Sequence, residues 1–140
     1  MKILLSSLLI MLSISSFGQT EQLHPIDREL QDCLNSDENS TTVGMTECIN
    51  TATWKWGEEL NRQYKILLSL LTDQQKERLK STQREWIRFR DKELQFTSQL
   101  YSDMQGTMWI PVAAQVKLDL IKHRTLELKN YTADLTAGKL

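Results

Sequence analysis

One long apolar stripe constrains the fold of this chain more than any other feature. Apolar or small residues recur in steps of three and four at Met45, Cys48, Ala52, Trp56, Leu60, Tyr64, Leu67 and Leu71. Such steps put side chains on one face of an α-helix of about seven turns, whereas a half-buried strand alternates with a period of two. Gly57 interrupts this stretch at a cost of about 1 kcal/mol relative to alanine, which weakens the helix without ending it. The stripe needs a partner surface, so it predicts packed helices.

Two shorter signals place helix starts on either side of this stretch. Pro25 can occupy the first turn of a short helix over residues 26–34, because a proline there loses no hydrogen bond. The polar run 35–42 predicts a loop, and the long helix starts near Thr41 or Thr42. Thr72 and Gln75 fit a capping box, so the next helix starts there.

The second half of the chain predicts two more long helices. One face of the helix after Thr72 carries Leu79, Gln83, Trp86, Arg90 and Leu94. Gly106 and Pro111 interrupt the pattern over residues 103–111, and a last helix runs from about Pro111 to Leu135. No strand-like alternation and no internal repeat is visible. The predicted fold is all-α: a long helical hairpin, a third long helix packed against it, and a short N-terminal helix.

The first 18 residues resemble a cleaved export signal. Lys2 is followed by an apolar and serine-rich run over residues 3–14, and small residues at Ser16 and Gly18 precede a cut before Gln19. The alternative is a retained N-terminal anchor, although the run is short for a membrane span. We expect a bacterial periplasmic or secreted protein whose single helical domain covers residues 19–140.

The two cysteines are expected to form a structural bridge. Cys33 and Cys48 both lie in the predicted mature chain, and an exported protein can form disulfides. A bridge would staple the short helix to the long one and contribute up to about 3 kcal/mol. Two free thiols or a catalytic pair are the alternatives, but the spacing is not that of a C-x-x-C motif.

Charge is unevenly divided along the chain. Residues 19–59 carry nine acidic and two basic side chains, whereas residues 60–140 carry nine acidic and fourteen basic ones. The full chain has a net charge of −1, which argues against a nucleic-acid binder. The acidic section either lies against the basic helices or faces a cationic partner. The acidic residues available for either role are Asp27, Glu29, Asp32, Asp37, Glu38 and Glu47.

Polar residues interrupt the apolar faces of the predicted helices. Asn61, Gln83, Arg90 and Arg124 fall on or next to these faces. Either they form a hydrogen-bond network that fixes the helix register, or they line a polar binding cleft. Arg90 could pair with Asp91, Glu93 or Asn61.

No catalytic or metal-binding arrangement is evident. His24 and His123 have no nucleophile at a recognisable spacing, and the pair Glu58 and Glu59 is typical of a solvated helix face. We therefore expect no enzyme activity, no metal and no cofactor.

A combination of short elements resembles the N-terminal domain of LprI-type lysozyme inhibitors, a family of small bacterial envelope proteins. The elements are Cys33, a methionine three residues before Cys48, an L-N-x-x-Y element with Asn61 and Tyr64, and Leu79 followed by a Q-R-x-W-x-x-F-R-D element with Gln83, Trp86, Arg90 and Asp91. The resemblance covers residues 33–94 well and extends more weakly through Arg124 to Leu128. It implies an all-helical fold, an envelope location, no catalysis, and stoichiometric binding of a lysozyme.

The chain departs from this family at two positions. Relatives often carry a cysteine shortly after the R-D element and another on the last helix, where this chain has Leu94 and Gln115 or Val116. Loss of both cysteines together supports a bond between Cys33 and Cys48. Leu94 and Val116 could replace the lost bridge by direct packing.

Two loops are candidates for the partner contact. Asp37 and Glu38 lie in the acidic loop beside the expected disulfide, and acidic residues suit a cationic lysozyme. Trp109 lies in the loop 106–111 and could anchor an interface, or plug the core under the helix ends. The alternative functions are an envelope interaction module without lysozyme contact and a small-molecule carrier that uses the stripe around Asn61, Gln83 and Arg90.

Overall fold

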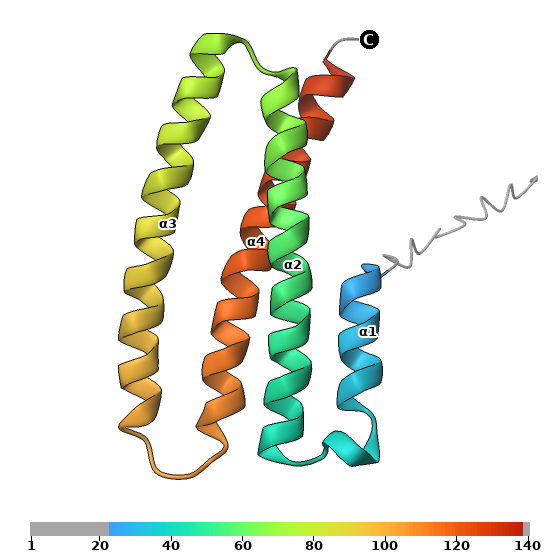
Figure 1. The fold of residues 1–140 in the computed structure, drawn as a ribbon, viewed down its shortest axis with the longest axis vertical. Helices are drawn as coiled ribbons and strands as arrows, with labels where there is room; N and C mark the ends of the chain where they lie inside the picture. The colour runs from blue at the N-terminus through green and yellow to red at the C-terminus, as the bar shows by residue number, and fades with distance from the viewer. Residues whose placement is uncertain (1–22, 139–140) are drawn as a thin grey trace, which may run out of the picture.

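A computed structural model describes residues 23–138, and these residues form helices joined by short turns (Figure 1). In chain order they are α1 (Pro25–Leu34), the 3₁₀ turn η1 (Asp37–Asn39), α2 (Thr42–Leu70), α3 (Asp73–Ser102) and α4 (Trp109–Ala137). Residues 23–138 contain no strand, so the predicted all-α fold is confirmed. The expected export signal lies outside the described residues.

The predicted helix starts agree closely with the structure. The Thr41 side chain accepts a hydrogen bond from the Gly44 N–H, and Thr72 forms a complete capping box with Gln75. The last helix begins at Trp109, slightly earlier than expected, and includes Pro111 in its first turn. A proline is tolerated there because the first N–H groups of a helix have no intrahelical acceptor.

The core lies mainly between α2 and α4, which contact each other along most of their length. The central side chain is Trp56, whose exposed fraction is 0%. The buried apolar residues that pack with it come from these two helices: Ile49, Ala52, Leu60, Leu67, Leu118, Ile121 and Leu128. Ile26 and Leu30 of α1 close the core on another side of α2. The long apolar stripe therefore has the role that its periodicity predicts.

The α2–α3 hairpin is more open than expected. The backbones of its two arms barely approach each other, and α3 instead packs on α4 over a shorter stretch (Figure 1). Thr97 is the one fully buried residue of α3, and Leu79 and Trp86 are half-buried against the core. The reason is compositional, since most positions of α3 are charged or polar and cannot be buried without partners.

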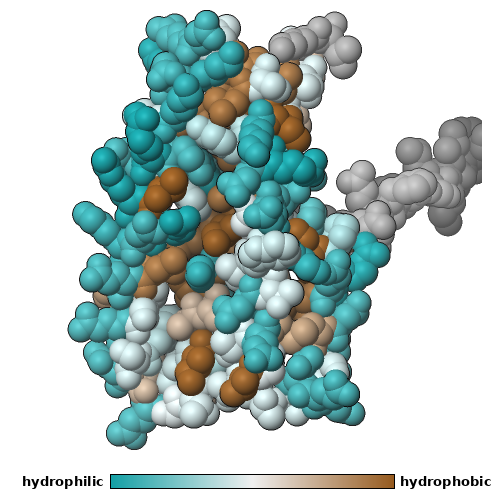
Figure 2. All heavy atoms as spheres, viewed as in Figure 1, coloured by the Kyte–Doolittle hydropathy of each residue, from teal (hydrophilic) through white to brown (hydrophobic). Residues whose placement is uncertain are grey.

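Several large apolar side chains remain on the surface. They include Val43 and Trp54 on α2, Phe89 and Phe96 on α3, and Ile110 on α4. Figure 2 shows pale and brown residues between the charged side chains that cover the flanks of the molecule. None of the helices in residues 23–138 carries an apolar stretch of the length that crossing a membrane requires.

Candidate functional site

The acidic end of the molecule is formed by the end of α1, η1 and the start of α2. Asp32, Asp37, Glu38 and Glu47 are exposed there, and none of the four takes part in an ion pair within residues 23–138. The other two acidic candidates are neutralised internally. Glu29 pairs with Lys55, and Asp27 pairs with Lys122 of α4 at 2.8 Å. The charge asymmetry is thus partly internal and partly presented to solvent.

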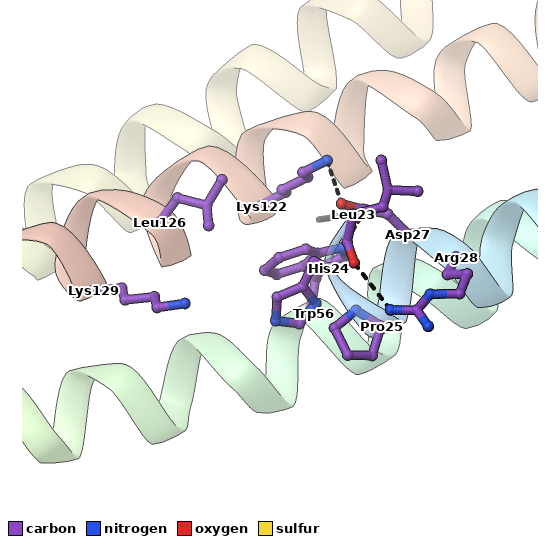
Figure 3. Close-up of a pocket in the computed structure, with 9 residues that line it drawn as sticks. All are labelled: Leu23, His24, Pro25, Asp27, Arg28, Trp56, Lys122, Leu126 and Lys129. Carbon is purple, nitrogen blue, oxygen red and sulfur yellow. Dashed lines mark hydrogen bonds and ion pairs between the residues drawn. The ribbon is translucent and has the colours of Figure 1, made fainter. Parts of the chain in front are cut away.

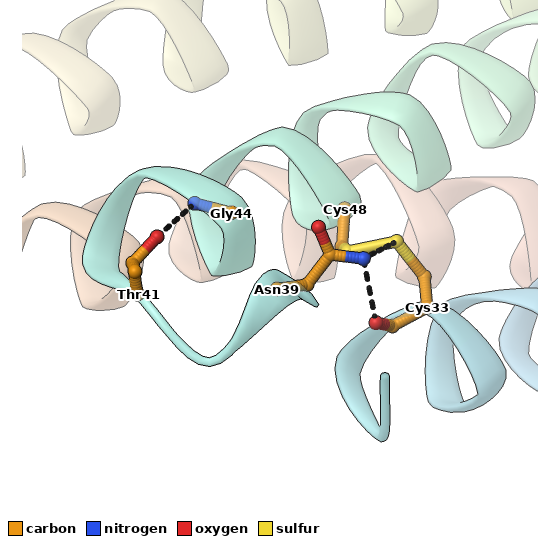
Figure 4. Close-up of a disulfide and its surroundings, with 5 residues drawn as sticks. All are labelled: Cys33, Asn39, Thr41, Gly44 and Cys48. Atoms are coloured by element: carbon orange, nitrogen blue, oxygen red, sulfur yellow. Dashed lines mark hydrogen bonds between the residues drawn. A yellow bond between two sulfur atoms is a disulfide. The ribbon is translucent and has the colours of Figure 1, made fainter. Parts of the chain in front are cut away.

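The acidic turn is held in place by covalent and steric contacts (Figure 4). Cys33 and Cys48 form the expected disulfide, with a Cα–Cα distance of 5.8 Å. The Asn39 amide donates a hydrogen bond to the Cys33 carbonyl oxygen at 3.0 Å. Gly44 permits a close approach, because a Cβ at this position would lie 2.6 Å from the Cα of Asn39. These contacts give Asp37 and Glu38 a fixed position.

Trp109, the second candidate for the partner contact, is half-buried. Its ring stacks on Tyr101 with a centroid separation of 5.9 Å, and its Nε1–H donates to the Gln105 carbonyl oxygen at 3.1 Å. Both contacts hold the α3–α4 connection together. A role of Trp109 in partner binding stays a prediction.

Arg124 is the centre of a polar network between α3 and α4. Its exposed fraction is 5%, its Nε donates to the Gln83 side-chain oxygen at 3.0 Å, and its Nη1 pairs with Glu127 at 2.6 Å. Tyr131 donates a further hydrogen bond to Glu127 at 2.8 Å. Partial burial raises the pKa of Glu127, but the hydrogen bonds from Arg124 and Tyr131 outweigh it and hold this pKa below its ordinary value.

Two guanidinium groups lie close to the indole of Trp86. Arg90 is 5.5 Å and Arg124 is 5.9 Å from the ring centroid, which are cation–π distances. Arg90 pairs with Asp91 at 2.6 Å, the first of the three partners considered from the sequence. The Nη2 of Arg124 is buried without a hydrogen-bond acceptor, so this arginine depends on its remaining partners.

The L-N-x-x-Y element faces the same region from α2. Tyr64 is half-buried against the core, whereas Asn61 is exposed and makes no side-chain hydrogen bond within residues 23–138. Asn61 shares one open depression with Gln83 and another with Arg90. The motif residues thus converge at α2, α3 and α4. Gln83 and Trp86 join α3 to α4 through Arg124, whereas the Asn61 side chain is free within the described residues.

A further depression lies where α1 meets α2 and α4 (Figure 3). Trp56 forms its floor, with the His24 ring centroid 4.4 Å away and Asp27 accepting from the indole Nε1 at 3.1 Å. Arg28 and Lys129 lie at its rim. Asp27 binds both the Trp56 indole and Lys122, so this depression ties α1 to the core, and its lining contains no nucleophile paired with a base.

Sequence reasoning missed the most exposed tryptophan. Trp54 is two residues from Trp56 and therefore points to the opposite side of α2, where its exposed fraction is 66%. A step of two residues from Trp56 places Trp54 on the face of α2 opposite the apolar stripe, and this step could have been read from the sequence. Residues 23–138 hold no group of three His, Cys, Asp or Glu side chains placed to bind a metal ion.

Comparisons with known proteins agree with this arrangement. A family model described as "Lysozyme inhibitor LprI" matches residues 33–128, which is more than half of the chain. The crystal structure of an uncharacterized protein from Burkholderia thailandensis is similar, with a TM-score of 0.76 and 25% sequence identity. The match covers 81% of this chain but only 56% of that one, so this chain spans just over half of the length of that relative. No curated protein matches.

Proposed function

Because the chain belongs to the LprI lysozyme inhibitor family, we propose that it is an exported protein that binds a lysozyme stoichiometrically and blocks its cleft. The observation that carries this proposal is the family match over residues 33–128, which includes the disulfide and the acidic turn. The proposed domain is residues 19–140 after removal of residues 1–18. Family members are inhibitors rather than enzymes, which agrees with binding as the mode of action.

The acidic turn is the proposed first contact with the enzyme. Lysozymes are generally cationic, and exposed carboxylates without internal partners attract such a surface. Asp37 and Glu38 meet this description, and the disulfide and Gly44 fix their backbone before binding. A fixed loop loses little conformational entropy when it docks, so more of the contact energy remains for affinity.

An inhibition titration tests the proposal. Oxidised protein is titrated against chicken-, goose- and invertebrate-type lysozymes at low and physiological salt. We expect saturable inhibition near a one-to-one ratio for at least one type. The double variant Asp37→Lys/Glu38→Lys should bind that enzyme roughly tenfold or more weakly, with a flatter dependence on salt.

A matched control changes the same charge at the opposite end of the molecule. Asp73 and Glu77 are exposed at the start of α3 and pair only with neighbouring lysines on that helix. The variant Asp73→Lys/Glu77→Lys should therefore keep its affinity, apart from the change in net charge. Equal losses in both variants would exclude the acidic turn, and no binding to any lysozyme would refute the proposed function.

The second candidate function is an envelope interaction module without lysozyme contact. The observation that favours it is the exposed apolar surface on α2 and α3, which suits a protein partner of another kind. Absence of inhibition across the panel, together with retained folding, would favour this alternative.

A further inference from the structure

The solvent face of α2 carries one continuous stripe that the fold itself does not use. Its members recur in steps of three or four and share one side of the helix: Val43, Glu47, Asn50, Trp54, Gly57, Glu58 and Asn61. All of them are exposed except Gly57, which is half-exposed. The stripe starts beside the acidic turn and spans roughly 27 Å along the helix.

Trp54 is an anchor-type side chain at the middle of this stripe. With 66% of its area exposed, its indole makes little use of the fold, in contrast to Trp56, Trp86 and Trp109. Exposed tryptophan is unfavourable in water and is enriched among the residues that dominate binding energy at protein interfaces. Trp54 is therefore available as an anchor for a protein partner.

Gly57 provides a second and independent observation. Glycine inside a helix is destabilising relative to alanine, and it is normally explained by close packing against a neighbouring element. Here a Cβ would meet no atom within 4 Å, so no packing inside the molecule requires glycine. The bare backbone therefore leaves room for a side chain of another molecule to approach α2 closely at this point.

The two residues together shape a recess beside α3. Helical side chains lean toward the helix N-terminus, so Asn61 leans over Gly57, and Gly57 leaves one side of the Trp54 indole uncovered. Glu58 lies at the same depression, and Lys117 of α4 and Arg90 of α3 form its far side. The recess is thus lined by an aromatic side chain, Trp54, by the bare backbone at Gly57 and by the amide of Asn61.

We infer that this stripe of α2 is the main docking surface for the cationic enzyme, with Trp54 as the anchor and the Gly57 recess receiving one of the enzyme's side chains. This inference rests on the proposed function. Charge supports it along the stripe, because Glu47 and Glu58 are exposed and have no ion-pair partner in the described chain. Arg90 and Lys117 on the far side of the recess suit an uncharged or acidic side chain of the enzyme at that point. Size supports it as well, since a stable interface needs about 800 Å² per partner and the three-residue turn η1 cannot supply that area.

Two single substitutions on this stripe test the inference against the lysozyme that the wild-type protein binds best. Trp54→Ala should weaken binding roughly tenfold or more, as loss of an anchor does. Gly57→Ala should weaken binding severalfold and at the same time raise the melting temperature by a few degrees, because alanine favours the helix and meets no neighbour. Opposite changes in stability and affinity cannot arise from misfolding.

Matched controls come from α3. Phe96→Ala removes an aromatic side chain with similar exposure from another surface, and Ser81→Ala changes an exposed helix position without clearing or filling a recess. Both should bind like the wild type. Wild-type affinity of the Trp54→Ala and Gly57→Ala variants would overturn this inference and leave the proposed function intact, whereas no lysozyme binding by the wild type would overturn both. The inference would also be overturned if Trp54→Ala left lysozyme binding unchanged and altered self-association or the binding of chito-oligosaccharides.

Discussion

The two arms of the helical hairpin have almost the same length but very different roles. α2 has 29 residues and buries nine of them, whereas α3 has 30 residues and buries one. α2 contacts both α1 and α4, and α3 contacts α4. One arm is therefore part of the core, and the other is attached to it from outside.

The difference shows how two kinds of stabilisation divide between the arms. α2 is held by the burial of apolar surface, which is non-directional and proportional to area. α3 is held largely by directional contacts with Arg124 of α4, which donates a hydrogen bond to Gln83 and lies over the Trp86 ring. We expect α3 to open at lower free energy than α2, because few buried contacts oppose its opening.

Replacement of one tryptophan by alanine in each arm should give the largest difference in stability. Trp56→Ala removes a wholly buried side chain and its hydrogen bond to Asp27, so unfolding free energy should fall by about 3–5 kcal/mol. Trp86→Ala removes a half-buried ring and should cost about 1–3 kcal/mol, because part of that ring already contacts solvent. Urea unfolding followed by circular dichroism measures both values. Equal costs would show that α3 belongs to the core as fully as α2.

Removal of the disulfide should affect only the side of α2 that faces α1. The double variant Cys33→Ala/Cys48→Ala opens the loop between the two cysteines, and the chain-entropy model gives a loss of about 3 kcal/mol. Hydrogen exchange should speed up most in α1 and η1. Exchange in α3 should change no more than global stability requires, and a selective change there would contradict the division between the arms.

Loss of the Gln83 side chain should loosen α3 selectively. Gln83→Ala leaves the Arg124 Nε without its acceptor, and an unsatisfied buried group costs about 1–3 kcal/mol. Amide exchange should therefore rise in α3 while the amides of α2 near Trp56 stay protected. Gln74→Ala, an exposed position on the same helix, is the matched control. Uniform acceleration across all helices would show that α3 does not open as a separate unit.

The sequence predicted α2 better than α3, because apolar periodicity determines the packing of α2 and polar contacts determine that of α3. The stripe from Met45 to Leu71 determined the face and length of α2, because burial of apolar residues leaves a regular pattern. Thr72 and Gln75 likewise marked the start of α3. The open geometry of the hairpin was not predictable in this way, since partners such as Gln83 and Arg124 are 41 residues apart and no local pattern links them.

The candidate site shows the same limit of local reasoning. The disulfide was predicted from two cysteines in a chain that was expected to be exported, and it is confirmed. The apolar periodicity identifies Trp56 and places Trp54 on the opposite face of α2. It does not show whether another helix covers that face. The free space at Gly57 depends on what α3 and α4 leave open, and this is a property of three helices together.

Protonation of Glu127 in acid should weaken the contact between α3 and α4. This is the smallest of the expected effects. Its folded pKa is below the ordinary value near 4.5, so the ionised form is favoured in the native state. A lowered pKa contributes stability that is fully present above the unfolded pKa and is lost as the pH falls through the folded one. Below about pH 4.5, Arg124 progressively loses its charged partner, and exchange in α3 should rise before global unfolding.

Two glutamine variants separate this effect from general acid destabilisation. Glu127→Gln keeps an acceptor near Arg124 but cannot titrate, so it should flatten the acid dependence of α3 exchange. Glu59 also has a lowered pKa, caused first by its hydrogen bond from Arg62. Both ion pairs lie within one helix, but Arg124 also donates to Gln83 of α3, whereas Arg62 makes no hydrogen bond to α3 within residues 23–138. Glu59→Gln should therefore reduce the acid dependence of global stability slightly and leave that of α3 exchange unchanged. If both variants altered α3 equally, the Arg124 network would not be what holds the outer arm, and the apolar contacts of Leu79 and Trp86 would have to carry it alone.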